Sequence, residues 1–188
     1  MRIIAGAKRG MKLFSPKTEV SRPITDRVKE SLFSVLYKYN VPNGKIVADL
    51  FCGVGSLGLE ALSRGAAFVN FVEMDQQVAA VLKRNIEKAT FVKKSKVIRA
   101  DAFKIGAPVV FDRQVYDVIF VDPPYSLTRD VGDGSLLSGL LVLLSRQLAP
   151  KGIVVVRTSR GTELLERYGR LEIIERRRWG TMAVTILR

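Results

Sequence analysis

The chain has 188 residues, 47% of them hydrophobic, and a formal net charge of +13 at pH 7. This length suits one domain with an ample core, and the hydrophobic content excludes an intrinsically disordered protein. A single cysteine and the absence of histidine exclude intramolecular disulfides, multi-cysteine clusters and histidine-based metal sites. We therefore expect no metal cofactor, and we interpret Cys52 as a small core residue.

The positive charge lies mostly outside the middle of the chain. Residues 1–40, 83–104 and 157–188 carry net charges of +6, +6 and +4, whereas the remainder carries −3. This distribution favours a polyanionic partner over a merely solvated basic surface. No apolar run approaches the ~20 residues needed to cross a bilayer, and the N-terminus lacks a signal-peptide core. We expect a cytoplasmic protein without a membrane partner.

The predicted elements begin with a β hairpin or extended arm over residues 1–20 and a leading helix within residues 21–40, capped by Thr25 or Asp26. The core, residues 41–188, alternates predicted strands and helices: strand 46–52, helix 57–64, strand 68–73, helix 75–90, strands 96–100 and 117–122, helix 135–148 and strand 152–157. This order is typical of a parallel sheet with helices on both faces. Two last strands, at about 170–177 and 181–187, predict an antiparallel closing hairpin.

A glycine-rich loop follows the first core strand. Asp49 lies within that strand, which leads into Gly53-Val54-Gly55-Ser56-Leu57-Gly58, a G-x-G-x-x-G pattern. Glycines let the backbone turn sharply and approach a ligand closely. Glu73 ends the next apolar run twenty residues after Gly53, where a carboxylate can bind ribose hydroxyls. The combination predicts a site for a nucleoside-containing cofactor.

Two features favour S-adenosylmethionine over a dinucleotide in that site. The charge of Asp49 would oppose a pyrophosphate but suits a cationic sulfonium and amino group. The second feature is Asp122-Pro123-Pro124-Tyr125, which has no obvious role in hydride transfer. A Walker A loop is excluded, because neither Lys-Ser nor Lys-Thr follows the glycines.

The Asp122-Pro123-Pro124-Tyr125 tetrapeptide follows an apolar run that reads as a buried strand. Open α/β sheets place their active sites at such strand ends. The Asp122 carboxylate and a backbone carbonyl can accept both N–H bonds of a planar amine, and prolines fix φ without donating an N–H. Tyr125 offers a face on which a base can stack. An ordinary turn is the alternative interpretation.

These residues resemble motif I of class I methyltransferases, and in detail the RsmD family, which methylates the guanine N2 amine in bacterial 16S ribosomal RNA. The resemblance rests on Asp49 to Ala66 and Asp122 to Tyr125, on Met1 to Gly6, on Gly10 to Leu13, and on Arg22 to Phe33. Gly180 to Val184 is similar but less specific. The resemblance covers essentially the whole chain. Arg157 departs from the family pattern, in which an acidic residue is expected directly after the apolar run Ile153–Val156.

The resemblance implies a single Rossmann-like methyltransferase domain over residues 1–188, with a mostly parallel, seven-stranded sheet. It implies catalysis by Asp122, Pro123, Pro124 and Tyr125, without a general base of tuned pKa. S-adenosylmethionine contacts are expected from Asp49, Phe51, Gly53, Gly55, Glu73, Met74, Asp101, Ala102 and Arg27. Asp101 would receive the adenine amine, or would simply cap a helix. Thr25 and Glu30 are also expected near the cofactor or target.

The implied partner is 16S rRNA, within the small ribosomal subunit or an assembly intermediate, and we expect a monomer. Two alternatives stay open. Asp-Pro-Pro-Tyr also suits methylation of the adenine N6 amine in DNA or RNA. A non-catalytic RNA-binding or ribosome-assembly protein could keep the same fold. The whole-chain resemblance favours guanine, and the presence of all the proposed amine and cofactor groups favours an enzyme.

Overall fold

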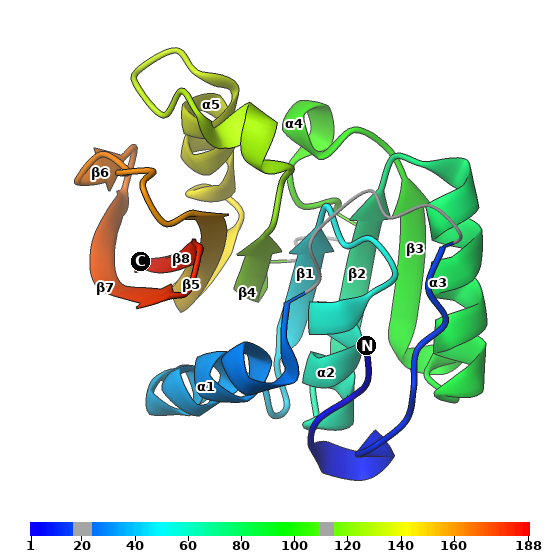
Figure 1. Cartoon of the computed structure of the whole chain (residues 1–188). Helices are drawn as coiled ribbons and strands as arrows, with labels where there is room; N and C mark the ends of the chain where they lie inside the picture. The colour runs from blue at the N-terminus through cyan, green and yellow to red at the C-terminus, as the bar shows by residue number, and fades with distance from the viewer. Residues whose placement is uncertain (17–23, 110–114) are drawn as a thin grey trace.

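A computed structural model describes residues 1–16, 24–109 and 115–188 of the chain. Its centre is one eight-stranded sheet in the order β3-β2-β1-β4-β5-β8-β7-β6 (Figure 1). The strands are β1 (Ile46–Leu50), β2 (Phe68–Glu73), β3 (Ser95–Arg99), β4 (Tyr116–Val121), β5 (Leu148–Ser159), β6 (Arg167–Tyr168), β7 (Leu171–Trp179) and β8 (Met182–Leu187). The first five strands are parallel, and β6, β7 and β8 pair antiparallel.

The helices cover both faces of the sheet. They are α1 (Asp26–Leu36), α2 (Ser56–Ser63), α3 (Gln76–Lys88), α4 (Ala102–Ile105) and α5 (Leu136–Leu144). Hydrophobic residues of α1, α2 and α3 share one buried cluster with alternate residues of the strands, and those of α4 and α5 share another. Successive strand side chains point to opposite faces, so the apolar runs of β1, β4 and β5 supply both clusters.

The predicted architecture is confirmed: a mostly parallel α/β sheet, closed by the β7–β8 hairpin. The structure adds β6, an eighth strand of two residues, and α4, a single turn of helix after β3. Thr25 is the cap of α1, since its hydroxyl accepts a hydrogen bond from Val28 N. None of the helices in the described ranges has the length and apolar character needed to span a membrane.

The N-terminal arm folds back on itself as predicted, within its described part. Ile3 N donates to Met11 O over 3.0 Å and Gly10 N donates to Ile3 O over 2.8 Å, around a short 3-10 turn at Gly6–Lys8. Residues 17–23, which include Arg22 and Pro23 of the family pattern, lie outside the described residues.

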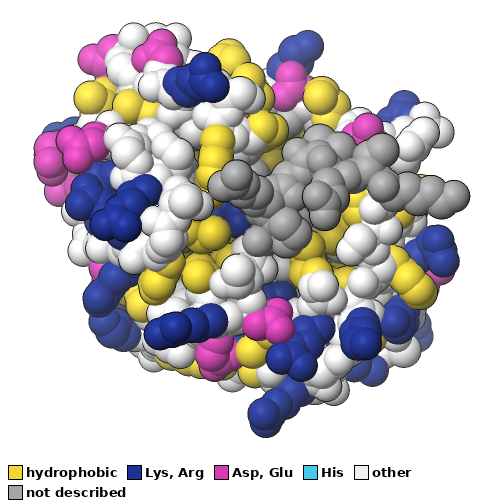
Figure 2. Space-filling model, viewed as in Figure 1, with side chains coloured by type: hydrophobic (Ala, Val, Ile, Leu, Met, Phe, Trp, Pro, Cys, Tyr) yellow, Lys and Arg dark blue, Asp and Glu magenta, His cyan; other side chains and the backbone are white. Residues whose placement is uncertain are grey.

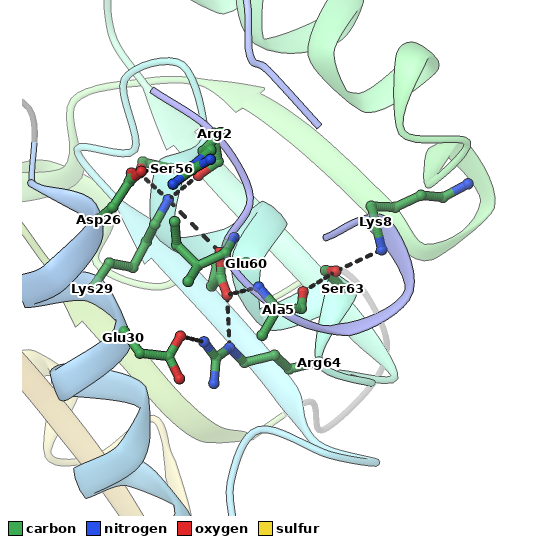
Figure 3. A network of polar contacts seen from close by, with 12 residues as sticks. Arg2, Ala5, Lys8, Asp26, Lys29, Glu30, Ser56, Glu60, Ser63 and Arg64 are labelled. Carbon is green, nitrogen blue, oxygen red and sulfur yellow. Dashed lines mark hydrogen bonds and ion pairs between the residues drawn. The ribbon is translucent and has the colours of Figure 1, made fainter. Parts of the chain in front are cut away.

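A buried polar network fastens this arm and α1 to α2 (Figure 3). At its centre the Glu60 carboxylate of α2 accepts hydrogen bonds from Ile4 N at 2.7 Å, Ala5 N at 3.0 Å and Arg64 Nε at 2.7 Å. Lys29 Nζ of α1 lies 3.7 Å from Glu60 Oε2. The helix that follows the glycine loop is thereby joined to both basic N-terminal elements.

Candidate active site

In the sheet, β2 and β3 lie on one side of β1, and β4 and β5 lie on the other. The strand order therefore reverses direction between β1 and β4. Crevices at such switch points, beyond the carboxyl ends of the strands, are where open α/β sheets bind ligands. Asp49 lies near the carboxyl end of β1, and Asp122 directly follows β4. The two acids singled out in the sequence therefore flank this switch point.

The glycine loop after β1 turns through left-handed backbone conformations. Gly53 and Gly55 have φ values of +55° and +88°, and Phe51, at +58°, shares this unusual region. A Cβ atom on Gly53 would meet nothing within 4 Å, so that side of the loop is open. Glycine therefore suits the left-handed backbone conformation at position 53 and leaves open space beside the loop.

Gly58 has a different role, because it brings α2 close to the sheet. A Cβ atom on Gly58 would lie 2.3 Å from Phe71 Cε1 and 2.9 Å from Asp49 Oδ2. The Gly58 N–H donates to Asp49 Oδ2 over 2.8 Å. The third glycine of the pattern therefore permits close helix–strand packing and also orients the acid of β1.

Glu73 at the end of β2 is held by the backbone of two neighbouring segments. Its Oε2 accepts a hydrogen bond from Gly53 N at 2.9 Å, and its Oε1 accepts one from Asp75 N at 2.9 Å. Asp75 in turn caps α3. The predicted ribose-binding acid is thus fixed directly beside the glycine loop, as the spacing in the sequence indicates.

Asp49 is only 1% exposed, and its Oδ1 has no hydrogen-bond partner among the residues that the structure describes. Burial raises the pKa of Asp49 to about 8. The hydrogen bond from Gly58 opposes this rise, the negative charges of Asp122 and Glu73 increase it, and the positive charge of Arg157 again opposes it. An unpartnered acceptor in an acidic, buried setting is suited to a cationic ligand.

Asp122 carries an ion pair that the sequence pattern did not indicate. Its Oδ1 lies 2.5 Å from Arg157 Nε, and the two side chains are 16% and 11% exposed. Burial raises the pKa of Asp122, and the charge and hydrogen bond of Arg157 oppose that shift. Arg157 stands where the resemblance to the family leads us to expect an acid, and here it faces the proposed catalytic carboxylate.

The rest of the tetrapeptide forms the start of a short 3-10 helix, Tyr125–Thr128. Pro123 is buried, Pro124 is exposed and Tyr125 is half-buried. Leu127 N donates to the carbonyl of Pro124 over 2.9 Å. The chain therefore turns into this short helix after the two prolines and does not continue the strand outward.

The remaining predicted residues lie at the ends of β1, β2 and β3 and on α1, at differing depths. Asp101 follows β3 and caps α4 by accepting from Phe103 N at 3.0 Å, and the next residue, Ala102, is buried. The Phe51 ring packs against the Phe103 ring, with 4.8 Å between centroids. The side chains of Met74, after β2, and Arg27, on the first turn of α1, are exposed.

Two hydrogen bonds therefore hold the acids to the glycine loop and the helix after it, one from Gly58 to Asp49 and one from Gly53 to Glu73, with Asp122 across the switch point. Arg157 is the functional candidate that sequence reasoning did not assign. The contact between Arg157 and Asp122 follows from the register of the two strands. Val121 of β4 pairs with Val156 of β5, so the residues that follow them, Asp122 and Arg157, point to the same face as each other. Cys52 is buried, which raises the pKa of its thiol well above the usual range.

Comparison with known proteins places this site in a family. All of residues 1–188 match the family model described as conserved hypothetical protein 95. Bacillus subtilis YlbH, provisionally described as an rRNA methyltransferase, is 34% identical over 188 residues, which cover 99% of this chain and 97% of that protein. The ribosomal RNA small subunit methyltransferase D of Haemophilus influenzae is 35% identical over 167 residues, covering 88% and 82%.

A solved structure agrees over the full length. Escherichia coli YhhF, provisionally described as a methyltransferase, matches with a TM-score of 0.81 and 31% identity, covering 100% of this chain and 96% of that one. The match of a whole-length family model, together with these relatives and the arrangement of motif I and the Asp-Pro-Pro-Tyr turn, shows that the chain belongs to the RsmD family of class I methyltransferases.

Proposed function

We propose that this protein uses S-adenosylmethionine to methylate the exocyclic N2 amine of a guanine in bacterial 16S rRNA. One observation carries the proposal: the Asp122 carboxylate lies across the β1–β4 switch point from the buried Asp49 and the glycine loop. The proposed amine-binding acid and the proposed nucleoside site thus lie at the same switch point of the sheet. The relative named ribosomal RNA small subunit methyltransferase D supports the choice of substrate.

The residues present fit S-adenosylmethionine. Asp49 has a buried, unpartnered oxygen suited to the cationic part of the cofactor, and Gly53 leaves open space beside the loop. Glu73 is fixed where it can accept from ribose hydroxyls. The remaining proposed contacts are those of Phe51, Gly55, Met74, Asp101, Ala102 and Arg27. The cofactor, when bound, supplies a methyl group that its sulfonium has already activated.

The protein's own contribution is to position and polarise the amine. Asp122 accepts one N–H of the amine, and the Pro123 carbonyl accepts the other. These hydrogen bonds favour a tetrahedral nitrogen whose lone pair is directed at the methyl group, so they stabilise the transition state more than the ground state. Tyr125 stacks on the unpaired base and holds it in line. Such positioning supplies much of the barrier reduction without a general base, and the nitrogen, once methylated, releases its extra proton to water.

A basic groove beside the site is the proposed path for the RNA. It is a hollow of about 320 Å³ between α1 and β7, lined by Ser31, Ser34, Val35, Lys38, Arg177, Arg178 and Trp179. Cations, hydroxyls and an aromatic ring are the groups that hold phosphates and unstacked bases. Lys38 and Arg177 also pair with Glu175, which leaves further donors on each cation for phosphate oxygens.

The groove lies at the same edge of the sheet as Asp122. Trp179 pairs with Met182 of β8, and Met182 pairs with Ser159 at the end of β5, the strand next to β4. Figure 2 shows Lys and Arg side chains along the left and lower parts of this face, over β7, α1 and the N-terminal arm. A polyanion along this face fits the net charge of +13. The proposed setting is cytoplasmic, with the small subunit or its assembly intermediate as partner and the protein acting as a monomer.

The test is transfer of a tritiated methyl group from S-adenosylmethionine to small-subunit particles that lack the modification, followed by nucleoside analysis. We expect label in N2-methylguanosine. Label in N6-methyladenosine would support the same mechanism but would show that the substrate is adenine and not guanine. No label, despite cofactor binding, would favour a non-catalytic RNA-binding protein. The Asp122→Ala variant should bind cofactor and fail to transfer the methyl group; full activity in this variant would refute the mechanism.

A further inference from the structure

Arg157 and Asp122 occupy adjacent positions on neighbouring parallel strands. Val121 pairs with Val156, so the residues that follow point to the same face, where their side chains meet at 2.5 Å between Nε and Oδ1. Both side chains are nearly buried, at 11% and 16% exposed. A charge pair shielded in this way interacts far more strongly than one at the surface.

Two other acids lie in the neighbouring segments. Asp49 of β1 interacts with the pair directly, because its pKa responds to both Asp122 and Arg157, and it also responds to Glu73 at the end of β2. The pKa of the Cys52 thiol, in the loop between them, responds to Asp49 and Glu73. Among the described residues, Arg157 is the cation whose charge lowers the pKa of both Asp49 and Asp122. Without it, Asp122 would be a buried carboxyl close to the acid Asp49, a setting that favours the protonated form.

The protonation state of Asp122 decides what it can do to an amine. An ionised carboxylate only accepts hydrogen bonds, whereas a protonated one also donates. A donor aimed at the amine nitrogen would occupy the lone pair that the reaction needs. Arg157 Nε engages Oδ1, which leaves Oδ2 for an N–H of the substrate.

We propose that Arg157 is a positioning residue that keeps the Asp122 carboxylate ionised and oriented to accept an N–H from the target amine. The proposal rests on the proposed function, in which Asp122 binds that amine. It also accounts for the departure of Arg157 from the family pattern: an arginine here contacts the amine-binding acid directly. Arg157 acts through Asp122 and itself contacts neither the methyl group nor the amine.

The first test measures Asp122 alone and needs no methyl transfer. The side-chain carboxyl carbon of Asp122 is followed by carbon-13 NMR against pH in the cofactor-free protein, with the signal assigned from the Asp122→Asn variant. We expect the titration midpoint to move to higher pH in Arg157→Gln and to return toward the original value in Arg157→Lys. An unchanged midpoint in folded Arg157→Gln protein would overturn the proposal.

Arg176→Gln is the matched control. Arg176 is another partly buried arginine of the same sheet, paired with Glu163, and each of the two arginines has one nitrogen without a hydrogen-bond partner among the described residues, Nη1 of Arg157 and Nε of Arg176. This variant should leave the Asp122 midpoint where it is. A shift as large as that of Arg157→Gln would mean that general loss of positive charge, and not the Asp122 contact, sets the titration.

The second test follows single-turnover methyl transfer against pH with saturating cofactor and RNA. We expect the acid limb of the Arg157→Gln profile to move to higher pH, so that the rate loss is severalfold larger at pH 6 than at pH 9. An equal loss at every pH would show a merely structural role and overturn the proposal. If the NMR midpoint moves but the unmodified protein methylates no RNA, the proposed function fails and the effect of Arg157 on Asp122 stands.

Discussion

Lys29 Nζ lies 3.7 Å from Glu60 Oε2, and both side chains are fully buried. Lys29 also donates to Arg2 O at 2.7 Å and to Ser56 Oγ at 3.2 Å. Burial lowers the pKa of Lys29, and the negative charge of Glu60 opposes that shift. Since Ser56 is the first residue of α2 after the glycine loop, this pair connects the N-terminal arm to the base of the proposed cofactor site.

Replacing Glu60 with Ala should destabilise the protein strongly. The change leaves the charges of Lys29 and Arg64 and the backbone N–H groups of Ile4 and Ala5 without their acceptor. Loss of one partner from a buried ion pair costs about 3–5 kcal/mol. Urea unfolding measures the difference. Glu172→Ala, which removes the exposed partner of Arg167, should cost less than about 1 kcal/mol, and equal losses in the two variants would contradict the role assigned to the network.

The buried Asp49 should make stability fall as the pH rises. Its pKa is raised from 3.8 to about 8 in the folded protein, so between these values the folded state keeps a proton that the unfolded chain releases. The free energy of unfolding therefore decreases with pH over that window. Asp49→Asn removes this term while its amide oxygen can still accept from Gly58. Unfolding at pH 5, 6.5 and 8 should show a smaller loss with pH in the variant than in the unaltered protein; matching slopes would contradict the assignment.

The same titration should govern cofactor affinity. Ionised Asp49 attracts a cation and protonated Asp49 does not, so affinity for S-adenosylmethionine should increase as the pH rises toward and past about 8. Isothermal titration calorimetry of the unaltered protein and Asp49→Asn measures this. The variant should bind more weakly at high pH and lack the increase. An increase of the same size in Asp49→Asn would assign the pH dependence to another group.

Gly58→Ala should weaken both the fold and the cofactor site. The new Cβ would fall 2.3 Å from Phe71 Cε1 and 2.9 Å from Asp49 Oδ2, so α2 or the Phe71 ring must move. Overpacking of this kind costs about 1–3 kcal/mol. Gly139→Ala is the control, because Gly139 lies within α5 and a Cβ atom added there would meet nothing within 4 Å; it should stabilise the helix by about 0.5–1 kcal/mol. Thermal unfolding and cofactor binding distinguish the two.

Apolar runs along the chain explain why most of the fold could be predicted from the sequence. The apolar runs of β1, β2 and β4 fill both buried clusters, and such runs are legible without a partner. The two-residue β6 and the single-turn α4 carry no periodicity. Strand β5 begins at Leu148, ahead of the predicted 152, because Leu148 pairs with Tyr116 before a register shift. That pairing depends on a distant segment.

In the candidate site, too, local features could be predicted from the sequence, whereas contacts between distant segments could not. Gly53, Gly58 and Glu73 follow from spacing along the chain, because a loop and the next strand end are local in an α/β unit. The ion pair of Arg157 depends on the alignment of β4 with β5, and the burial of Lys29 depends on an acid in α2. Residue type alone predicts an exposed lysine. Such partners become visible only when the strands and helices are placed together.

The groove between α1 and β7 should bind RNA through charge and stacking. Lys38→Gln should lower affinity for a small-subunit RNA fragment and reduce the slope of log affinity against log salt by about 0.7–0.9, the value for one phosphate contact.

Trp179→Ala should lose about 1–3 kcal/mol of binding from a stacked base, and Trp179→Phe should keep most of it. Fluorescence anisotropy between low and moderate salt measures both quantities. Arg167→Gln removes the same charge from β6, where the side chain is 67% exposed and pairs with Glu172. If that control loses as much affinity and slope as Lys38→Gln, the RNA is held by the overall charge of the protein and not by the groove.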